Sequence, residues 1–187
     1  MAATFEPAAV APLILTLALD PDTQAWLEAL RQAHFPPARN LIPAHVTLFH
    51  ALPGEELAAI LAGLAEACAS LAPCAARIGP PRFLGRGVAL EVAAPEVVRL
   101  RARLAATWQR WLTLQDRQGW RPHATVQNKV AADRARALHA ALAASLPIRE
   151  ARTEGLTLWH YRGGPWEPAG EFRFAESSRF CIGMASN

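Results

Sequence analysis

Two short His-x-Thr patterns carry the residues of this sequence that are best suited to chemistry. They are His45-Val46-Thr47 and His123-Ala124-Thr125, each in a strand-like stretch. Successive side chains of a strand point to opposite faces, so the His and the Thr of one pattern share a face. Two such strands brought together would surround one small cavity with two imidazoles and two hydroxyls. Imidazoles can act as general base and general acid near neutral pH, and hydroxyls can donate hydrogen bonds to an anion.

A single His-x-Thr is common by chance, and the shared context of these two is what favours a function. Pro43 stands two residues before His45, and Pro122 directly precedes His123. An alanine-rich stretch with helical character follows each pattern. This repetition suggests a duplicated unit with one motif in each half. A phosphodiester or a cyclic phosphate would fit between the two motifs.

The pair resembles the hallmark of the 2H phosphoesterase superfamily, whose best-known branch is the bacterial and archaeal 2′-5′ RNA ligase family. The segment from Leu156 to Trp166 ends in Gly-Gly-Pro-Trp and is similar to a late strand and turn of one branch. The resemblance implies an α+β, bilobal fold with antiparallel sheets, flanking helices and a central cleft. Many members follow the second motif with Leu-x-Arg, whereas this chain has Val126-Gln127-Asn128-Lys129.

The resemblance also implies an activity, a metal-independent cyclic phosphodiesterase that opens 2′,3′-cyclic phosphates of RNA ends or nucleotides to 2′-phosphates. His45 and His123 would be the acid–base pair, and Thr47 and Thr125 would hold the phosphate oxygens, with no cofactor and no metal. Run backwards, the site could act as an ATP-independent 2′-5′ RNA ligase. Two other interpretations stay open: a non-catalytic RNA-end or nucleotide-binding protein, and a structural domain in which both motifs are accidents. Accidental motifs should not converge in space.

Five further residues are candidates for binding the substrate. They are Phe49, Arg121, Gln127, Lys129 and Tyr161. Phe49 and Gln127 share strand parity with the motif residues, and Phe49 could offer a stacking face to a base or pack in the core. Arg121 and Lys129 are the cations nearest the second motif and could neutralise phosphate charge or be ordinary strand-end charges. Tyr161 is the only tyrosine.

The other histidines and the tryptophans are expected to lie outside the site. His50 follows His45 by five residues, so strict alternation points it to the opposite face, although a role at the strand end stays open. His34 and His139 are expected at the surface and His160 in a packed position. The six tryptophans fall mostly at helix or turn positions that favour the core.

Composition predicts one domain with a substantial core. The 187 residues are 52% hydrophobic and 19% charged, and the formal net charge is only +3. That charge is weaker than the basic surface of a dedicated nucleic-acid binder and suits a pocket for a phosphorylated ligand. We expect a monomer of two similar lobes, approximately residues 13–94 and 95–176, that binds RNA ends or small cyclic-phosphate nucleotides.

Cysteine usage and the first residues predict a cytoplasmic protein that does not enter a membrane. Cys68, Cys74 and Cys181 form no metal-binding or disulfide pattern, which favours a reducing compartment. The first basic residue is Arg31, so the basic start of a secretory signal is missing. The apolar stretch 8–19 contains Pro12 and is too short to cross a bilayer.

Hydrophobic periodicity and Pro/Gly punctuation predict the elements that would hold the motifs. Strands are expected over residues 13–19, 44–50, 75–78, 88–92, 123–127, 155–162 and 171–174. Helices are expected from Asp20-Pro21 to Pro36-Pro37, from Glu55 to Cys68, from Pro95 to Leu112 and over 131–145. Their order, β-α-β-α-β-β followed by α-β-α-β-β, is an α+β pattern with one motif strand in each part.

Overall fold

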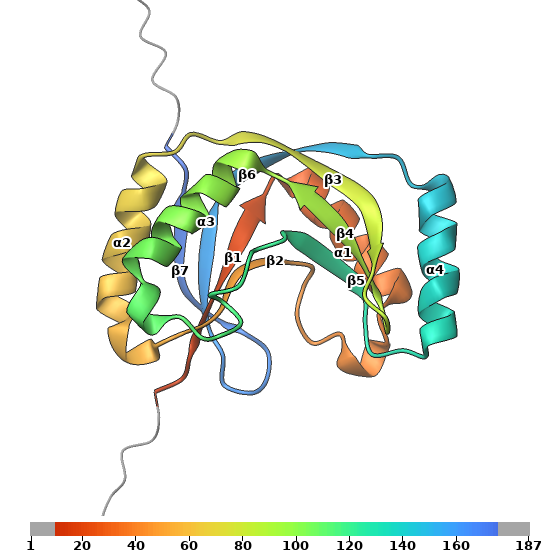
Figure 1. Ribbon diagram of the computed structural model, residues 1–187, viewed down its shortest axis with the longest axis horizontal. Coiled ribbons are helices and arrows are strands. Elements are labelled where there is room, and N and C mark those ends of the chain that lie inside the picture. Colours follow the sequence, from red (N-terminus) through yellow and green to blue (C-terminus); the bar gives the residue numbers. More distant parts are fainter. Residues whose placement is uncertain (1–9, 176–187) are drawn as a thin grey trace, which may run out of the picture.

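A computed structural model describes residues 10–175, and the order of its elements is the one expected from the sequence (Figure 1). The strands are β1 (Leu13–Leu19), β2 (Val46–Leu52), β3 (Cys74–Phe83), β4 (Val88–Ala93), β5 (His123–Gln127), β6 (Arg149–His160) and β7 (Glu167–Arg173). The helices are α1 (Pro21–His34), α2 (Leu57–Ala69), α3 (Pro95–Thr107) and α4 (Ala132–Ser145). Single 3₁₀ turns lie at Pro37–Arg39, Gly54–Glu56 and Gln109–Trp111.

All seven described strands form one hydrogen-bonded system in which every pairing is antiparallel. The strand order is β1-β2-β5-β4-β3-β6-β7, and β6 also pairs with β1. Six strands therefore close on themselves, and β7 is added at the outer side of β6. The α+β class with antiparallel strands is confirmed, and the closure brings the two motif strands, β2 and β5, next to each other.

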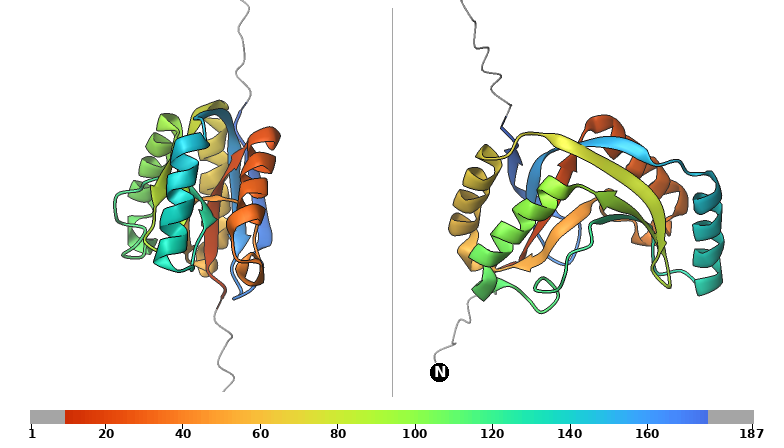
Figure 2. Two further views of the ribbon diagram at one scale, coloured as in Figure 1. Left: turned by 90° about the vertical axis from the view of Figure 1, so that its right-hand side faces the viewer. Right: turned by 45° about the horizontal axis from the view of Figure 1, so that its top comes forward.

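The helices lie at two ends of the molecule, with the strands between them (Figures 1 and 2). At one end α2 contacts α3 and β7, and at the other α1 contacts β5 while α4 contacts β3. Each end thus combines elements from both halves of the chain, because β3 and β6 run from one end to the other (Figure 2). The division into units 13–94 and 95–176 stays a prediction. In residues 10–175 no helix is long and apolar enough to cross a membrane.

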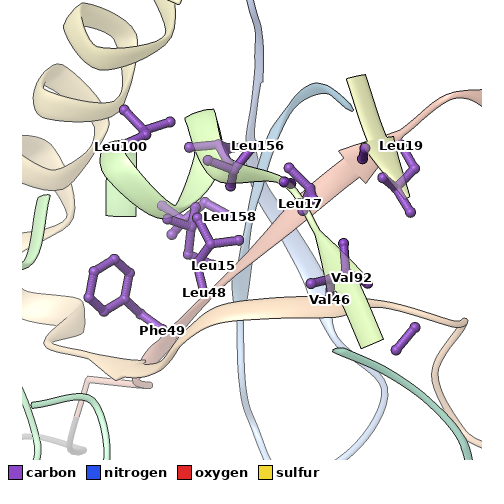
Figure 3. Close-up of a cluster of buried hydrophobic side chains, with 14 of the residues drawn as sticks. Leu15, Leu17, Leu19, Val46, Leu48, Phe49, Val92, Leu100, Leu156 and Leu158 are labelled. Atoms are coloured by element: carbon purple, nitrogen blue, oxygen red, sulfur yellow. The ribbon is translucent and has the colours of Figure 1, made fainter. Parts of the chain in front are cut away.

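The apolar run at the start of the chain forms the central strand β1, which is buried as predicted. Leu13 and Leu15 are fully buried, and Leu17 packs in the same cluster with residues of β2 and β6 (Figure 3). A strand covered on both faces needs apolar side chains at successive positions rather than alternation. Burying each such leucine contributes about 1.5–3 kcal/mol, so β1 anchors the sheet against which the motif strand β2 pairs.

Helix α1 begins where the Asp20-Pro21 pair predicts. One carboxylate oxygen of Asp20 accepts a hydrogen bond from the Thr23 amide at 2.9 Å, and the other accepts one from the Arg152 amide at 2.7 Å. The first bond caps the helix, and Pro21 suits the first helical position because no amide hydrogen is needed there. The second bond ties the start of α1 to β6.

Strand β3 is longer than the sequence predicts. It continues through Gly79-Pro80-Pro81 to Phe83, where we expected a connecting segment, and its pairing with β4 shifts register between Ile78 and Pro81. Prolines donate no ladder hydrogen bond and are tolerated at such irregularities. The outer part of β3 pairs Arg82 with Ala89 of β4, the strand that pairs with β5. The prediction also missed the first six residues of β6 and extended α3 beyond Thr107.

Candidate active site

The two motif strands pair with each other at the middle residue of each motif. β2 and β5 pair antiparallel, with Val46 opposite Ala124. Both side chains are buried, at 1% and 0% exposure. One residue further along in each direction, an antiparallel register sets His45 beside Thr125 and Thr47 beside His123. The middle residues therefore anchor the core face, and the four polar side chains share the opposite face.

These four polar side chains line one cavity of about 180 Å³. The lining residues are Ile14, His45, Thr47, His50, His123, Thr125 and Trp166. Two motifs that are distant in sequence thus meet around a space large enough for a phosphate group. The convergence contradicts the interpretation that both motifs are accidents of sequence.

Each motif histidine is oriented by the backbone carbonyl two residues before it. The Nδ1 of His45 lies 2.7 Å from the Pro43 oxygen, and the Nδ1 of His123 lies 2.8 Å from the Arg121 oxygen. A carbonyl only accepts, so Nδ1 carries the proton in both rings and Nε2 is left for a ligand. Arg82 Nη2 is also 3.1 Å from Nδ1 of His123, and with that nitrogen protonated the guanidinium acts as a nearby positive charge.

Burial keeps both imidazoles neutral. It is the main cause of a shift that lowers the pKa of His45 to about 4; the Pro43 carbonyl opposes this shift, and the positive charge of Arg31 adds to it. The pKa of His123 is lowered by burial and then by the charge of Arg82, against the Arg121 carbonyl. Near pH 7 each ring therefore has a free lone pair on Nε2, as a general base requires.

A register shift follows the motif in strand β2. Thr47 pairs with Thr16, but Phe49 pairs with the next β1 residue, Leu15, so β2 holds one extra residue around Leu48. Such a bulge reverses the alternation of side chains beyond it. Leu48 and Phe49 are consequently both fully buried.

The bulge overturns two sequence predictions. Phe49 shares strand parity with the motif residues and was a candidate to flank the pocket or to pack in the core; it packs in the core (Figure 3). Its ring centroid lies 5.5 Å from that of Trp108. His50 was expected on the opposite face, but it lines the cavity with the motif histidines. Parity counted from His45 is wrong for both residues because the extra residue lies between them and the motif.

Strand β5 has a bulge of the same kind after its own motif. Thr125 pairs with Ala89, but Gln127 pairs with the adjacent β4 residue, Val88. Gln127 is 2% exposed and does not line the cavity, so its predicted place beside the phosphate is wrong for the same reason as that of Phe49. Its side-chain oxygen is buried without a hydrogen-bond partner in the described part of the chain.

Comparisons with known proteins agree with this geometry. A sequence model of the 2′-5′ RNA ligase superfamily matches residues 19–165, which is well over half of the chain. The chain belongs to this superfamily. The match confirms the resemblance to 2H phosphoesterases that the His-x-Thr pair indicates. None of the curated protein sequences matches the chain.

Solved structures of other proteins share the fold. TT0787 of Thermus thermophilus superposes with a TM-score of 0.65 at 19% identity, over 89% of this chain and 99% of that one. E. coli LigT complexed with 3′-AMP gives a TM-score of 0.61 at 15% identity, over 89% and 99%. A structure described as a phosphoesterase gives 0.58 at 19% identity, over the same shares. Identities this low show a common fold alone.

The threonine carbonyls of the two motifs are held by side chains from outside the strand pair. The Thr47 oxygen accepts a hydrogen bond from Trp120 Nε1, and the Thr125 oxygen accepts one from Arg31 Nη1, both at 2.8 Å. Arg31 is 3% exposed and its Nε also donates to the Asn40 side chain at 2.8 Å. The backbone at each bulge is thus fixed, which in turn fixes the direction of the motif side chains.

A second cavity, of about 350 Å³, adjoins the first. It shares Thr47, His50 and His123 with the first cavity, and its cationic lining residues are Arg82, Arg101 and Arg121. The predicted substrate residue Arg121 therefore lies next to the motifs. Lys129 and Tyr161 line neither cavity, so these two predicted contacts are not brought to the site.

Trp166, which covers the first motif histidine, was not predicted from the sequence. Its ring centroid lies 4.7 Å from that of His45, at a tilt of 55°. Trp166 ends the Gly-Gly-Pro-Trp turn, in which Gly163 has a φ of 84° that favours glycine. Placing the tryptophans in the core was wrong for this one, and the turn motif was the signal that singled it out.

The described residues offer no evident metal site. No group of three or more His, Cys, Asp and Glu side chains in residues 10–175 is arranged to hold an ion. Cys68 and Cys74 are free thiols, the first of them buried. The polar and aromatic groups that line the first cavity are imidazoles, hydroxyls and one indole ring.

Proposed function

We propose that the protein is a metal-independent cyclic phosphodiesterase that opens the 2′,3′-cyclic phosphates of RNA ends or nucleotides to 2′-phosphates. The observation that supports it is that His45, Thr47, His123 and Thr125 line one small cavity, with both imidazoles presenting Nε2. A pocket with two proton-transfer groups and two hydroxyl donors suits a reaction in which one bond to phosphorus forms as another breaks.

In the proposed reaction water attacks phosphorus in line with the bond to the 3′ oxygen. One histidine accepts the water proton at Nε2, and the other donates a proton to the departing 3′ oxygen. The phosphorus–3′-oxygen bond breaks, and the phosphate stays on the 2′ oxygen. Thr47 and Thr125 donate hydrogen bonds to the non-bridging oxygens. The anionic substrate favours protonation of the acid histidine, which burial by itself disfavours.

The same site could run in reverse as an ATP-independent 2′-5′ RNA ligase, which the description of the superfamily favours as second candidate. Water is the more abundant nucleophile, so we rank hydrolysis first. Structures of LigT carry 3′-AMP, phosphate and ATP, which supports RNA ends or small nucleotides as ligands of this chain. The proposal includes a cytoplasmic location, where the thiols of Cys68 and Cys74 would stay reduced.

The test is a screen of 2′,3′-cyclic mononucleotides and short RNAs that end in a 2′,3′-cyclic phosphate, with the product identified by ³¹P NMR. We expect 2′-phosphates and no loss of rate in the presence of a chelator. The control variant is His34→Ala, which changes a histidine at the end of α1 that lines neither cavity. A rate that falls on chelation and returns with a divalent ion would make the protein a metallophosphoesterase. Binding without turnover would make it a nucleotide-binding protein.

A further inference from the structure

A third imidazole, that of His50, lies in the same cavity as the two motif histidines. It lines both the small cavity and the larger one beside it, and its side chain is 43% exposed. It stands immediately after the β2 bulge, which turns it to the face of His45 and Thr47. The equivalent position of β5, five residues after the motif histidine, is the neutral Asn128, which lines neither cavity.

His50 is held by a buried carboxylate. Its Nδ1 lies 2.9 Å from Asp116 Oδ1, and Asp116 is 1% exposed. Asp116 also accepts hydrogen bonds from the backbone amides of His50 and Ala51. Hydrogen bonds from His50 and Ala51 outweigh burial and lower the pKa of Asp116, so the group is a carboxylate that only accepts. The Nδ1 of His50 must carry a proton, and Nε2 is the ring nitrogen left to meet a ligand.

The partner of Nδ1 distinguishes His50 from the other two imidazoles of the cavity. Among residues 10–175, the seven that line this cavity include no lysine and no arginine. The two motif histidines rest against uncharged backbone carbonyls, whereas His50 rests against a carboxylate, which stabilises an imidazolium. An imidazolium would donate a charge-assisted hydrogen bond to a phosphate oxygen.

We propose that His50 is a phosphate-binding residue of this site, which donates from Nε2 to a non-bridging oxygen of the substrate phosphate, and that Asp116 is the residue that positions it. The inference rests on the proposed function only in so far as the cavity binds a phosphate group. It differs from that function in requiring no turnover. A purely structural role for His50 would end at its hydrogen bond to Asp116.

The variant His50→Asn separates the two roles. The amide nitrogen of asparagine occupies the place of Nδ1 and can still donate to Asp116, but nothing replaces Nε2. The probe is inorganic phosphate, titrated into the wild type, His50→Asn and the control His34→Asn by calorimetry. We expect His50→Asn to weaken phosphate binding about 10–100-fold, the loss typical of one hydrogen bond to a charged group, and the control to bind as the wild type does. Unchanged binding by a folded His50→Asn overturns the proposal.

A second measurement on the wild type covers the case in which the variant does not fold. Ring ¹⁵N signals of the histidines are followed by NMR as phosphate is added. We expect the Nε2 signal of His50 to shift as phosphate saturates the site, because this nitrogen meets the phosphate directly. A signal that does not move overturns the proposal, as does a wild type that binds no phosphate. Phosphate binding through His50 in a protein that hydrolyses no cyclic phosphate would sustain this inference and reject the proposed function.

Discussion

The two motif strands, β2 and β5, share the features that aim their side chains. In each, the histidine Nδ1 donates to the carbonyl two residues earlier, and one extra residue follows the threonine. In each, the threonine carbonyl accepts a hydrogen bond from a distant side chain, Trp120 or Arg31. What the fold repeats is therefore the orientation of an imidazole and a hydroxyl.

The surroundings of the two strands differ. The ring of His45 lies under Trp166, whereas His123 lies beside the guanidinium of Arg82. After the bulge, β2 presents His50 to the cavity, while Asn128 of β5 lines neither cavity. The difference shows that a repeated scaffold can orient two imidazoles in the same way and still surround them with different side chains. Four predictions test how far the likeness and the difference extend.

The largest expected effect is on turnover by the two histidines. His45→Ala and His123→Ala should each lower kcat/KM for a 2′,3′-cyclic nucleotide by about 10²–10⁴-fold, the range of general acid–base catalysis. The double variant should be little worse than either single one, because residues that act as a unit are not additive. Near-normal hydrolysis by either single variant would reject the shared mechanism. His34→Ala serves as the control.

The next effect is on stability, and it compares Arg31 and Trp120, the two side chains that donate hydrogen bonds to the carbonyls of Thr125 and Thr47. Arg31→Met should lower the free energy of unfolding by about 2–4 kcal/mol, because several buried acceptors lose their donor. Trp120→Phe removes one neutral hydrogen bond and should cost only about 0.5–1.5 kcal/mol. Urea denaturation measures both. Equal losses would mean that the two strands are supported with the same strength.

A smaller effect is expected at the two hydroxyls. Thr47→Ala and Thr125→Ala should each reduce kcat/KM by about 2–10-fold, since each removes one neutral hydrogen bond and leaves proton transfer intact. Serine at either position keeps the hydroxyl and should restore most of the rate. Because each threonine lies beside the histidine of the other motif, the two losses should be similar. A large difference between them would show that one hydroxyl alone holds the phosphate.

The sequence predicted the class of the fold, the order of its elements and the convergence of the motifs. The reasons are local: the apolar run of β1, the Asp20-Pro21 helix start and the strand parity of His45 with Thr47 depend on neighbouring residues. The one long-range feature that was predicted is the meeting of β2 and β5, because two motifs of the same kind suggest a shared site.

What the sequence could not predict lies beyond the two bulges. A bulge depends on the register of the neighbouring strand, so no parity count from His45 could place Phe49 in the core or His50 in the cavity. Asp116, the partner of His50, stands 66 residues away in sequence and was reached only through tertiary structure. Trp166 belongs to the Gly-Gly-Pro-Trp turn, which the sequence indicated. Its contact with His45 depends on how that turn packs against the start of β2, which the sequence does not specify.

The last prediction concerns the pH dependence of stability, and it tests the difference between the two histidines. Burial is the main cause that lowers the pKa of His45 from 6.5 to about 4. Between these pH values the His45 ring is protonated in the unfolded chain and neutral in the folded protein. The free energy of unfolding should therefore be fully retained above pH 6.5 and decrease as the pH falls towards 4. His123 contributes in the same direction. Because Trp166 covers His45, His45→Gln should flatten this slope more than His123→Gln does, as measured by urea denaturation between about pH 4 and pH 7. A stronger flattening by His123→Gln would mean that Arg82, rather than Trp166, dominates the electrostatics of the cavity.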